Sequence, residues 1–175
     1  ENNTPDRQLS KEERLIRKKY RALMAHLRSL PTDRDGYGMI HQDAHLGNLF
    51  VDEEYNLTLF DFDDCVYGHF IYDIAMVLFY SSMWGEKDPA GFTNRFMPVF
   101  FQGYREHNRL DPVWLKELPG FLKLREIDLF AAILFAFGPQ PEDKWCAHYL
   151  DGRRERIEND VPYIDFDWES LAEHL

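Results

Sequence analysis

The chain has 175 residues, of which 45% are hydrophobic and 15% aromatic, and this predicts one globular domain with an adequate core. Its 31 acidic and 20 basic residues give a net charge of −11, which disfavours nucleic acid and anionic membranes as partners because both select clustered positive charge. Cys65 and Cys146 supply neither a disulfide framework nor a metal-binding spacing. The apolar runs are too short to span a membrane, and no signal peptide or initial Met is present. We therefore expect a cytoplasmic protein that is a piece of a longer chain.

The N-terminal part predicts an unstructured stretch followed by an amphipathic helix. Residues 1–8 are polar without periodicity and are expected to form a linker or a frayed end. Ser10 begins a capping box with Glu13, and apolar residues then recur at helical spacing up to Pro31. The polar face of this helix carries a basic stripe that could meet phosphate, although such a face is more often simply solvated.

A β-hairpin follows a short polar loop. Two β-prone runs, residues 49–52 and 57–60, flank a polar turn. Paired residues of two strands lie about 4.5–5.5 Å apart at Cα, so a hairpin of this length returns Asp61 to the side of Asn48. An amide oxygen and a carboxylate then converge, and both are the hard oxygen donors that Mg²⁺ prefers. Asp43, five residues before Asn48, can face a different ligand.

An acid, an amide five positions later and a second acid beyond a hairpin form the arrangement that phosphoryl transfer uses. One carboxylate accepts or orients the attacking hydroxyl, while the amide and the second carboxylate hold metal ions on the nucleotide phosphates. Here these roles fall to Asp43, Asn48 and Asp61. The alternative is that all three are solvated in surface turns and have no chemical role.

The motif His41-x-Asp43-x-His45-x-x-Asn48, followed by Asp61-Phe62-Asp63, resembles the aminoglycoside phosphotransferase family. That family includes choline-kinase-like and homoserine-kinase-like enzymes that share the protein-kinase fold. The resemblance covers about residues 38–78, and the flanking helices agree only in pattern. By this resemblance only the C-terminal lobe of the fold is present.

The resemblance implies a role for each motif residue. Asp43 would be the catalytic base, and Asn48 and Asp61 would hold Mg²⁺ on ATP or GTP. His41 and Asp73 would brace the catalytic loop rather than touch substrate. Two positions depart from the family: Gln42 stands where glycine is usual, and Leu46 where proline is frequent. Neither change removes a functional group, so both bear on the conformation of the loop.

A strongly apolar helix is expected from about residue 70 to residue 83, ending near Gly85. Apolar residues on every side of it indicate burial. Asp73 lies within this helix, and a buried carboxylate needs hydrogen-bond donors. Backbone amides or His41 in the catalytic loop could supply them. Alternatively, Asp73 lies in the exposed first turn, where it favours the helix dipole.

More helices complete the chain. Asp88-Pro89 begins one that runs to about residue 107, with Pro98 expected to kink it. Asp111-Pro112 opens another helical region, which Pro119-Gly120 interrupts before a long helix to residue 137. A last main helix is expected over residues 142–160.

The whole pattern predicts an α+β, mostly helical fold. Residues 9–175 would form the C-terminal lobe of a protein-kinase-like fold, with a small β-hairpin carrying the metal-binding loops. No Val-Ala-Ile-Lys-like strand precedes His41, and Gly36-Tyr37-Gly38 lacks the third glycine of a phosphate-binding loop. The nucleotide-binding N-terminal lobe is therefore absent, and we expect this part alone to have little or no activity.

The leading hypothesis is the C-lobe of an ATP-dependent phosphotransferase acting on a hydroxyl of a small molecule. The resemblance places the acceptor among the later helices, where aromatic and acidic groups would suit an amine-bearing substrate of aminoglycoside-like, choline-like or homoserine-like type. The candidate contacts are Trp84, Glu142, Asp143, Trp145, Tyr149, Glu155, Glu158 and Asp160.

Two alternatives remain open. The first is a non-catalytic binding module that retains the kinase-like fold. The second is a metal-dependent hydrolase in which His41, Asp43 and His45 bind zinc or iron. That site needs further ligands, and the scattered candidates are His26, His69, His107, His148 and His174. A packed or hydrogen-bonded His45 is the favoured interpretation.

Overall fold

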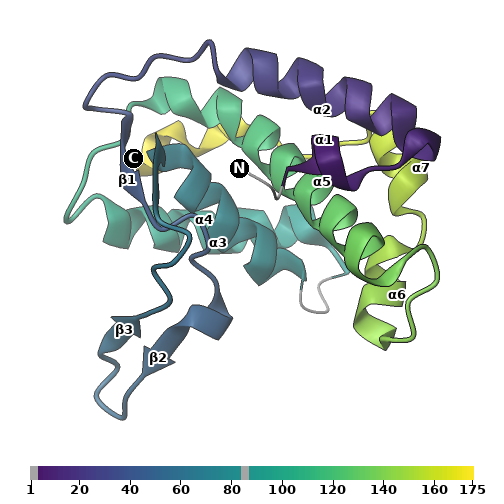
Figure 1. The fold of residues 1–175 in the computed structure, drawn as a ribbon. Helices are drawn as coiled ribbons and strands as arrows, with labels where there is room; N and C mark the ends of the chain where they lie inside the picture. The colour runs from purple at the N-terminus through teal and green to yellow at the C-terminus, as the bar shows by residue number, and fades with distance from the viewer. Residues whose placement is uncertain (1–3, 84–86) are drawn as a thin grey trace. The chain divides into compact units, whose positions relative to one another are not determined.

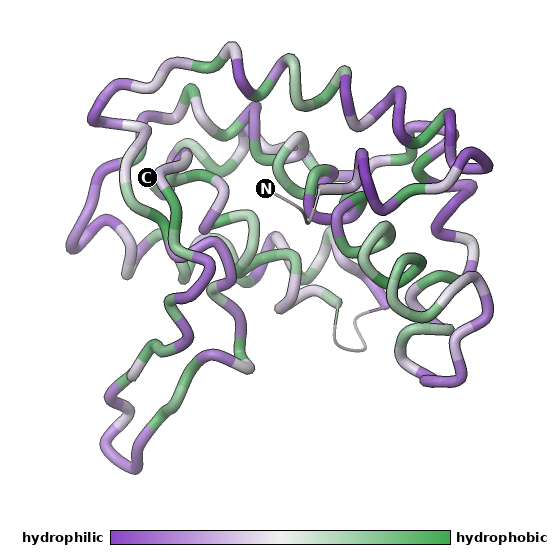
Figure 2. The backbone as a smooth tube through the Cα atoms, in the orientation of Figure 1, coloured by the Kyte–Doolittle hydropathy of each residue, from purple (hydrophilic) through white to green (hydrophobic). Residues whose placement is uncertain are grey.

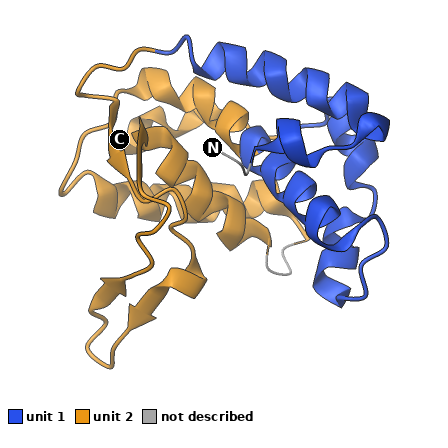
Figure 3. Cartoon of the chain, in the orientation of Figure 1, with its two compact units in different colours: residues 1–30, 123–163 blue, residues 31–122, 164–175 orange. Residues whose placement is uncertain are grey.

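The computed structural model describes residues 4–83 and 87–175, which form two compact units (Figure 3). Unit 1 comprises residues 1–30 and 123–163, and unit 2 comprises residues 31–122 and 164–175. The prediction of an α+β, mostly helical chain with a small hairpin is confirmed (Figure 1). None of the helices in these described ranges is both long enough and apolar enough to cross a membrane.

Unit 1 begins with two short helices, α1 (Pro5–Gln8) and the 3₁₀ helix η1 (Lys11–Glu13). The expected frayed end is therefore helical from Pro5, and Arg21 donates a hydrogen bond to Asp6 at 2.8 Å. The predicted capping box is confirmed, because the side chain of Glu13 accepts from the backbone amide of Ser10 and that of Ser10 caps the helix start.

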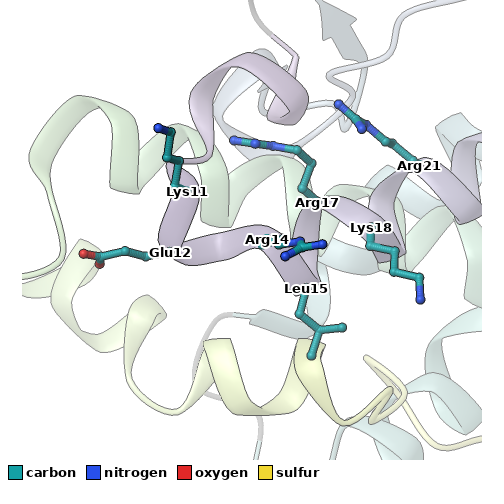
Figure 4. Close-up of a pocket in the computed structure, with 7 residues that line it drawn as sticks. All are labelled: Lys11, Glu12, Arg14, Leu15, Arg17, Lys18 and Arg21. Carbon is teal, nitrogen blue, oxygen red and sulfur yellow. The ribbon is translucent and has the colours of Figure 1, made fainter.

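The long helix α2 (Arg14–Leu27) buries Ile16, Tyr20 and Leu27. Leu15, which the apolar pattern assigned to the buried face, is 44% exposed. It lies instead in a groove on the basic face of the helix, together with Lys18 and other charged side chains (Figure 4). The buried aromatic Tyr20 completes the inner face, so the predicted pattern is right at Ile16 and Leu27 and wrong at Leu15.

The helices between residues 118 and 158 differ from the sequence prediction at two points. Helix α5 (Leu118–Phe137) begins before Pro119-Gly120 and is not interrupted there, because proline is tolerated in the first helical turn. The expected single helix over residues 142–160 is two helices, α6 (Lys144–Leu150) and α7 (Arg153–Glu158). Gly152, at φ +64°, turns the chain between them.

A buried ionic cluster holds this part of unit 1. The side chain of Glu126 has no exposed surface, and its carboxylate pairs with Lys123 and, at 2.7 Å, with Arg153. The Tyr149 hydroxyl donates to the backbone carbonyl of Glu126 at 3.1 Å, and the Arg153 guanidinium lies 4.5 Å from the centre of the Tyr149 ring. Burial raises the pKa of Tyr149, so its hydroxyl stays protonated as a donor.

Unit 2 contains a two-stranded antiparallel sheet that the sequence did not reveal in full. Strand β1 (Tyr37–Ile40) pairs with β4 (Val66–His69), in a register that places Tyr37 opposite His69. The expected start of a helix at Phe70 is correct, but the four residues before it are a strand. Gly68 within this strand packs closely, since a Cβ there would lie 2.5 Å from Ile40.

Helix α3 (Phe70–Met83) confirms the predicted apolar helix, and eight of its residues are buried. It contacts β1, β4 and two other helical segments, α4 (Pro89–Tyr104) and η3 (Pro112–Glu117). Pro98 lies inside α4 without ending it. Near the C-terminal end, the 3₁₀ helix η4 (Trp168–His174) packs on η3 and α4.

The predicted hairpin is confirmed as β2 (Leu49–Val51) and β3 (Leu57–Leu59), with Leu49 opposite Leu59. It projects from the rest of unit 2 (Figure 1) and carries apolar residues along both strands (Figure 2). Phe50 is 71% exposed and Leu57 is 68% exposed. A two-stranded hairpin of this kind has no core of its own within the described chain.

Candidate active site

Helix α3 fixes the start of residues 41–48, which we call the catalytic loop after its expected role, through the half-buried Asp73. Its two carboxylate oxygens accept hydrogen bonds from the backbone amides of His41 and Gln42, both at 2.8 Å. The acid therefore satisfies two consecutive N–H groups at the point where β1 ends. Gln42 has a φ of +67°, a left-handed conformation that costs a residue with a side chain about 1–2 kcal/mol. The paired hydrogen bonds offset that cost.

The buried His41 ties the catalytic loop to the segment after the hairpin. Its Nδ1 accepts from the backbone amide of Asp43 at 3.3 Å, and its Nε2 lies 3.0 Å from the carbonyl oxygen of Phe60. Because Nδ1 is the acceptor, the proton belongs on Nε2, which donates to Phe60. The imidazole thus links the loop that carries Asp43 to the residue immediately before Asp61.

The catalytic loop brings Asp43 and Asn48 into direct contact. The side-chain nitrogen of the buried Asn48 donates to the backbone carbonyl of Asp43 at 3.0 Å and to its carboxylate Oδ2 at 3.2 Å. His45 joins the same oxygen, because its Nε2 lies 3.3 Å from Asp43 Oδ2. The amide nitrogen of Asn48 is therefore occupied, and its Oδ1 is the atom left for an external ligand.

The hairpin returns the chain to this loop. The backbone amide of Phe60 donates to the carbonyl of Asn48 at 3.1 Å, so Asp61 directly follows the residue paired with Asn48. Asp61 is exposed and has a φ of +66°. A left-handed residue immediately after a strand turns the chain sharply, and aspartate tolerates this conformation better than most residues do.

The donor set fits a divalent cation held partly by a nucleotide. Asn48 Oδ1 and the Asp61 carboxylate are hard oxygen donors, and Mg²⁺ is usually bound by one or two protein groups together with phosphates and waters. Within residues 4–83 and 87–175, no three His, Cys, Asp or Glu side chains are placed to hold a metal ion.

Several of the candidate substrate contacts have local structural partners instead. Asp143 accepts from the Cys146 amide at 2.8 Å and caps α6, and Asp160 pairs with Lys19. Tyr149 is buried. The exposed candidates are Glu142, Asp143, Trp145, Glu155 and Asp160, and Glu158 is half-buried; all lie in unit 1, while Trp84 lies outside the described residues.

Sequence reasoning did not foresee the part played by Tyr80 of α3, whose ring packs edge-on against that of His45 with centroids 4.7 Å apart. The spacing offers a signal, since Tyr80 follows Asp73 by seven positions, which is two turns along one side of a helix. Both residues therefore face the catalytic loop.

Comparisons with known proteins identify a family and individual relatives of the chain. The model of the phosphotransferase enzyme family, APH, matches residues 2–113. Amicoumacin kinase of Bacillus subtilis (strain 168) is 39% identical over 155 residues, which are 86% of this chain and 46% of that protein.

Two solved structures are similar as well. The amicoumacin kinase hAmiN, in complex with AMP-PNP, Ca²⁺ and Ami, superposes with a TM-score of 0.89 at 32% identity, covering 98% of this chain and 52% of that one. The microcompartment-associated aminopropanol kinase gives a TM-score of 0.61 at 25% identity, covering 91% and 48%. The chain thus spans about half the length of these relatives. Because the family model matches well over half of its residues, the chain belongs to the phosphotransferase enzyme family.

Proposed function

We propose that this chain is the catalytic lobe of a kinase that transfers the γ-phosphoryl group of ATP to a hydroxyl of a small, amine-bearing molecule. The observation that carries the proposal is the contact between Asp43 and Asn48 on a loop to which the hairpin returns Asp61. Phosphoryl transfer uses an acid, an amide and a second acid near one another, and we assign these roles to Asp43, Asn48 and Asp61.

Each group has a distinct task in this proposal. Asp43 accepts the proton of the acceptor hydroxyl, or orients that hydroxyl, as it attacks. Asn48 Oδ1 and the Asp61 carboxylate would hold Mg²⁺, which neutralises charge on the nucleotide phosphates when bound. His41 and Asp73 touch neither reactant. They keep the catalytic loop and the segment before Asp61 in fixed relation, through the hydrogen bonds to Gln42 and Phe60.

The relatives support the nucleotide, the metal and the acceptor class. One structure contains AMP-PNP and Ca²⁺, so a nucleotide with a divalent cation is compatible with this fold, and we propose Mg²⁺ in the reaction. Another relative is named for aminopropanol, which bears both an amine and a hydroxyl. The net charge of −11 also favours a cationic acceptor.

A second lobe is required for this activity. The chain spans about half the length of its relatives. The hairpin next to the catalytic loop exposes apolar residues, including Phe50 and Leu57, and exposed apolar surface of this kind is typical of an interaction site. We propose that the nucleotide-binding lobe covers these residues. The 175-residue chain alone should then show little or no turnover of ATP.

The test joins this chain to a nucleotide-binding lobe and measures ATP consumption in the presence of amino alcohols. Activity should require an acceptor hydroxyl, and Asp43→Asn should lower kcat by about 10²–10⁴-fold, the usual contribution of a positioned acid or base. Replacing ATP by GTP in the same assay identifies the phosphoryl donor. Magnesium-dependent nucleotide binding with no acceptor-dependent turnover would instead support a non-catalytic binding module.

A further inference from the structure

His45 is the residue of the catalytic loop to which the proposed function gives no task. Its Nδ1 accepts a hydrogen bond from the backbone amide of Gly47 at 2.9 Å. A nitrogen that accepts cannot also carry the proton, so this bond assigns the proton to Nε2. The protonated nitrogen then faces Asp43, whose Oδ2 lies 3.3 Å away.

The ring is confined on both sides. Tyr80 packs edge-on against it with centroids 4.7 Å apart. Gly47 approaches so closely that a Cβ at that position would lie 2.7 Å from the Cε1 atom of His45. An imidazole held in this way has little freedom to rotate, so its Nε2–H keeps one direction.

That direction matters because Asp43 Oδ2 now has two side-chain donors in reach. Asn48 Nδ2 lies 3.2 Å away and His45 Nε2 lies 3.3 Å away. Rotation of the Asp43 carboxylate would lose both contacts. A carboxylate that must meet an acceptor hydroxyl gains from a fixed orientation, because misplacement of a reacting group by about 1 Å can cost about 10²-fold in rate.

We propose that His45 is a positioning residue that orients the Asp43 carboxylate through Nε2–H, while Gly47 and Tyr80 hold the imidazole in the required tautomer and plane. The proposal rests on the proposed phosphotransferase function, because the orientation of Asp43 affects the rate only when Asp43 takes part in that reaction. The alternative is that His45 only fills space beneath the loop.

Two conservative variants of His45 each keep one of the two hydrogen bonds of the ring and remove the other. In His45→Asn, the amide oxygen takes the place of Nδ1 and can accept from Gly47, but the shorter side chain has no donor that reaches Asp43. In His45→Gln, the amide nitrogen takes the place of Nε2 and can donate to Asp43, but the bond to Gly47 is lost. The same pair of changes at the exposed His148 of α6 provides the matched control.

The kinetic test uses the two-lobed protein. We expect His45→Asn to lower kcat by about 10²-fold with KM for ATP and for the acceptor within about twofold. His45→Gln should recover most of that loss, and both His148 variants should match the wild type. A space-filling role predicts the opposite order, with the Gln variant no better than the Asn variant and with losses that follow thermal stability; that result would overturn the proposal.

A second measurement does not depend on turnover. Long-range ¹H–¹⁵N correlation spectra of the 175-residue chain should show the His45 ring with its proton on Nε2, and a proton on Nδ1 would refute the assigned geometry. The two levels of failure are also distinct. An inactive wild type, with no effect of Asp43→Asn, rejects the proposed function and this inference together. An active wild type that tolerates His45→Asn rejects the inference alone.

Discussion

Asp73 accepts a hydrogen bond from the backbone amide of His41 across 32 positions of sequence, at 2.8 Å. Its second oxygen accepts from the next amide, that of Gln42, at the same distance. One carboxylate on helix α3 thus holds the two residues that connect β1 to the catalytic loop. Helix α3, which packs against β1 and β4, therefore fixes the loop, and this attachment also positions Asp43.

The first prediction concerns this attachment. Asp73→Asn keeps one accepting oxygen but turns an NH₂ group toward the second backbone amide, which leaves that donor unsatisfied in a half-buried site. We expect the free energy of unfolding to fall by about 1–3 kcal/mol. Urea denaturation measures it, and amide hydrogen exchange should become faster at His41 and Gln42. Asp35→Asn, at an exposed position of the same unit, is the control and should change stability by less than about 0.5 kcal/mol.

The second prediction concerns the left-handed backbone of Gln42. Glycine adopts a φ of +67° without strain, but it also gives the unfolded chain more freedom, and the two effects nearly cancel. Gln42→Gly should therefore change the free energy of unfolding by less than about 1 kcal/mol. Gln42→Val should cost about 1–3 kcal/mol, because a β-branched residue is strained there.

Gln102, exposed on helix α4, provides the matched control for this pair of variants. Gln102→Gly should cost about 1 kcal/mol, the usual penalty for glycine inside a helix. Equal losses for glycine at the two positions would show that Gln42 is not strained in solution.

The hairpin and helix α3 were predictable from sequence because their signals are local. Two β-prone runs around a polar turn, and one apolar run of helical length, were confirmed within a residue or two of their observed ends. The capping box at Ser10 and Glu13 was equally local, and it was confirmed as well.

The missed features depend on contacts between distant segments or on a short turn. Strand β4 has four residues, including Gly68, and exists because it pairs with β1 some thirty positions earlier. The break between α6 and α7 needed only a left-handed Gly152, which an otherwise helical pattern concealed. In the candidate site, the residue types of the motif were visible, but the contact of His45 with Tyr80 arises only when α3 packs against the loop.

The third prediction tests the metal ligands. In the two-lobed protein, Asp61→Asn should weaken Mg²⁺-dependent nucleotide binding by at least about tenfold, because a neutral amide is a weaker ligand for a hard cation than a carboxylate is. Calorimetric titration with AMP-PNP, with and without Mg²⁺, measures the effect. Asp64→Asn, at an exposed position three residues later, should leave the affinity within about twofold of the wild type. Equal losses for both variants would indicate a general charge effect rather than coordination by Asp61.

The fourth prediction concerns the ionic cluster of unit 1. Glu126→Gln removes the negative charge that lies between Lys123 and Arg153 and leaves both cations without their carboxylate partner in a buried setting. Breaking a buried ion pair in this way typically costs about 3–5 kcal/mol, and urea denaturation would measure it. Glu155→Gln, at an exposed position of α7, should cost less than about 0.5 kcal/mol. A small loss at Glu126 would mean that solvent reaches the cluster.

The fifth prediction is a pH dependence caused by His69. Burial lowers the pKa of this imidazole below its ordinary value of 6.5, and the hydrogen bond to the carbonyl of Pro31 offsets only part of the effect. The ring lies against Tyr37, Trp114 and Phe121, with centroid distances of 5.0, 5.3 and 5.7 Å, and this apolar setting disfavours the charged form.

The sign of the effect follows from proton binding. Below about pH 6.5 the unfolded chain takes up a proton at His69 that the folded chain resists, so the free energy of unfolding falls as the pH is lowered toward the folded pKa. Carboxylates also make the free energy of unfolding fall on acidification. The difference in the free energy of unfolding between the wild type and His69→Asn isolates the contribution of the imidazole. Urea denaturation at pH 7.5 and pH 5.5 should show that the stability advantage of the wild type over this variant shrinks at the lower pH. An advantage that is constant or grows on acidification would mean that the folded state accommodates the charged ring.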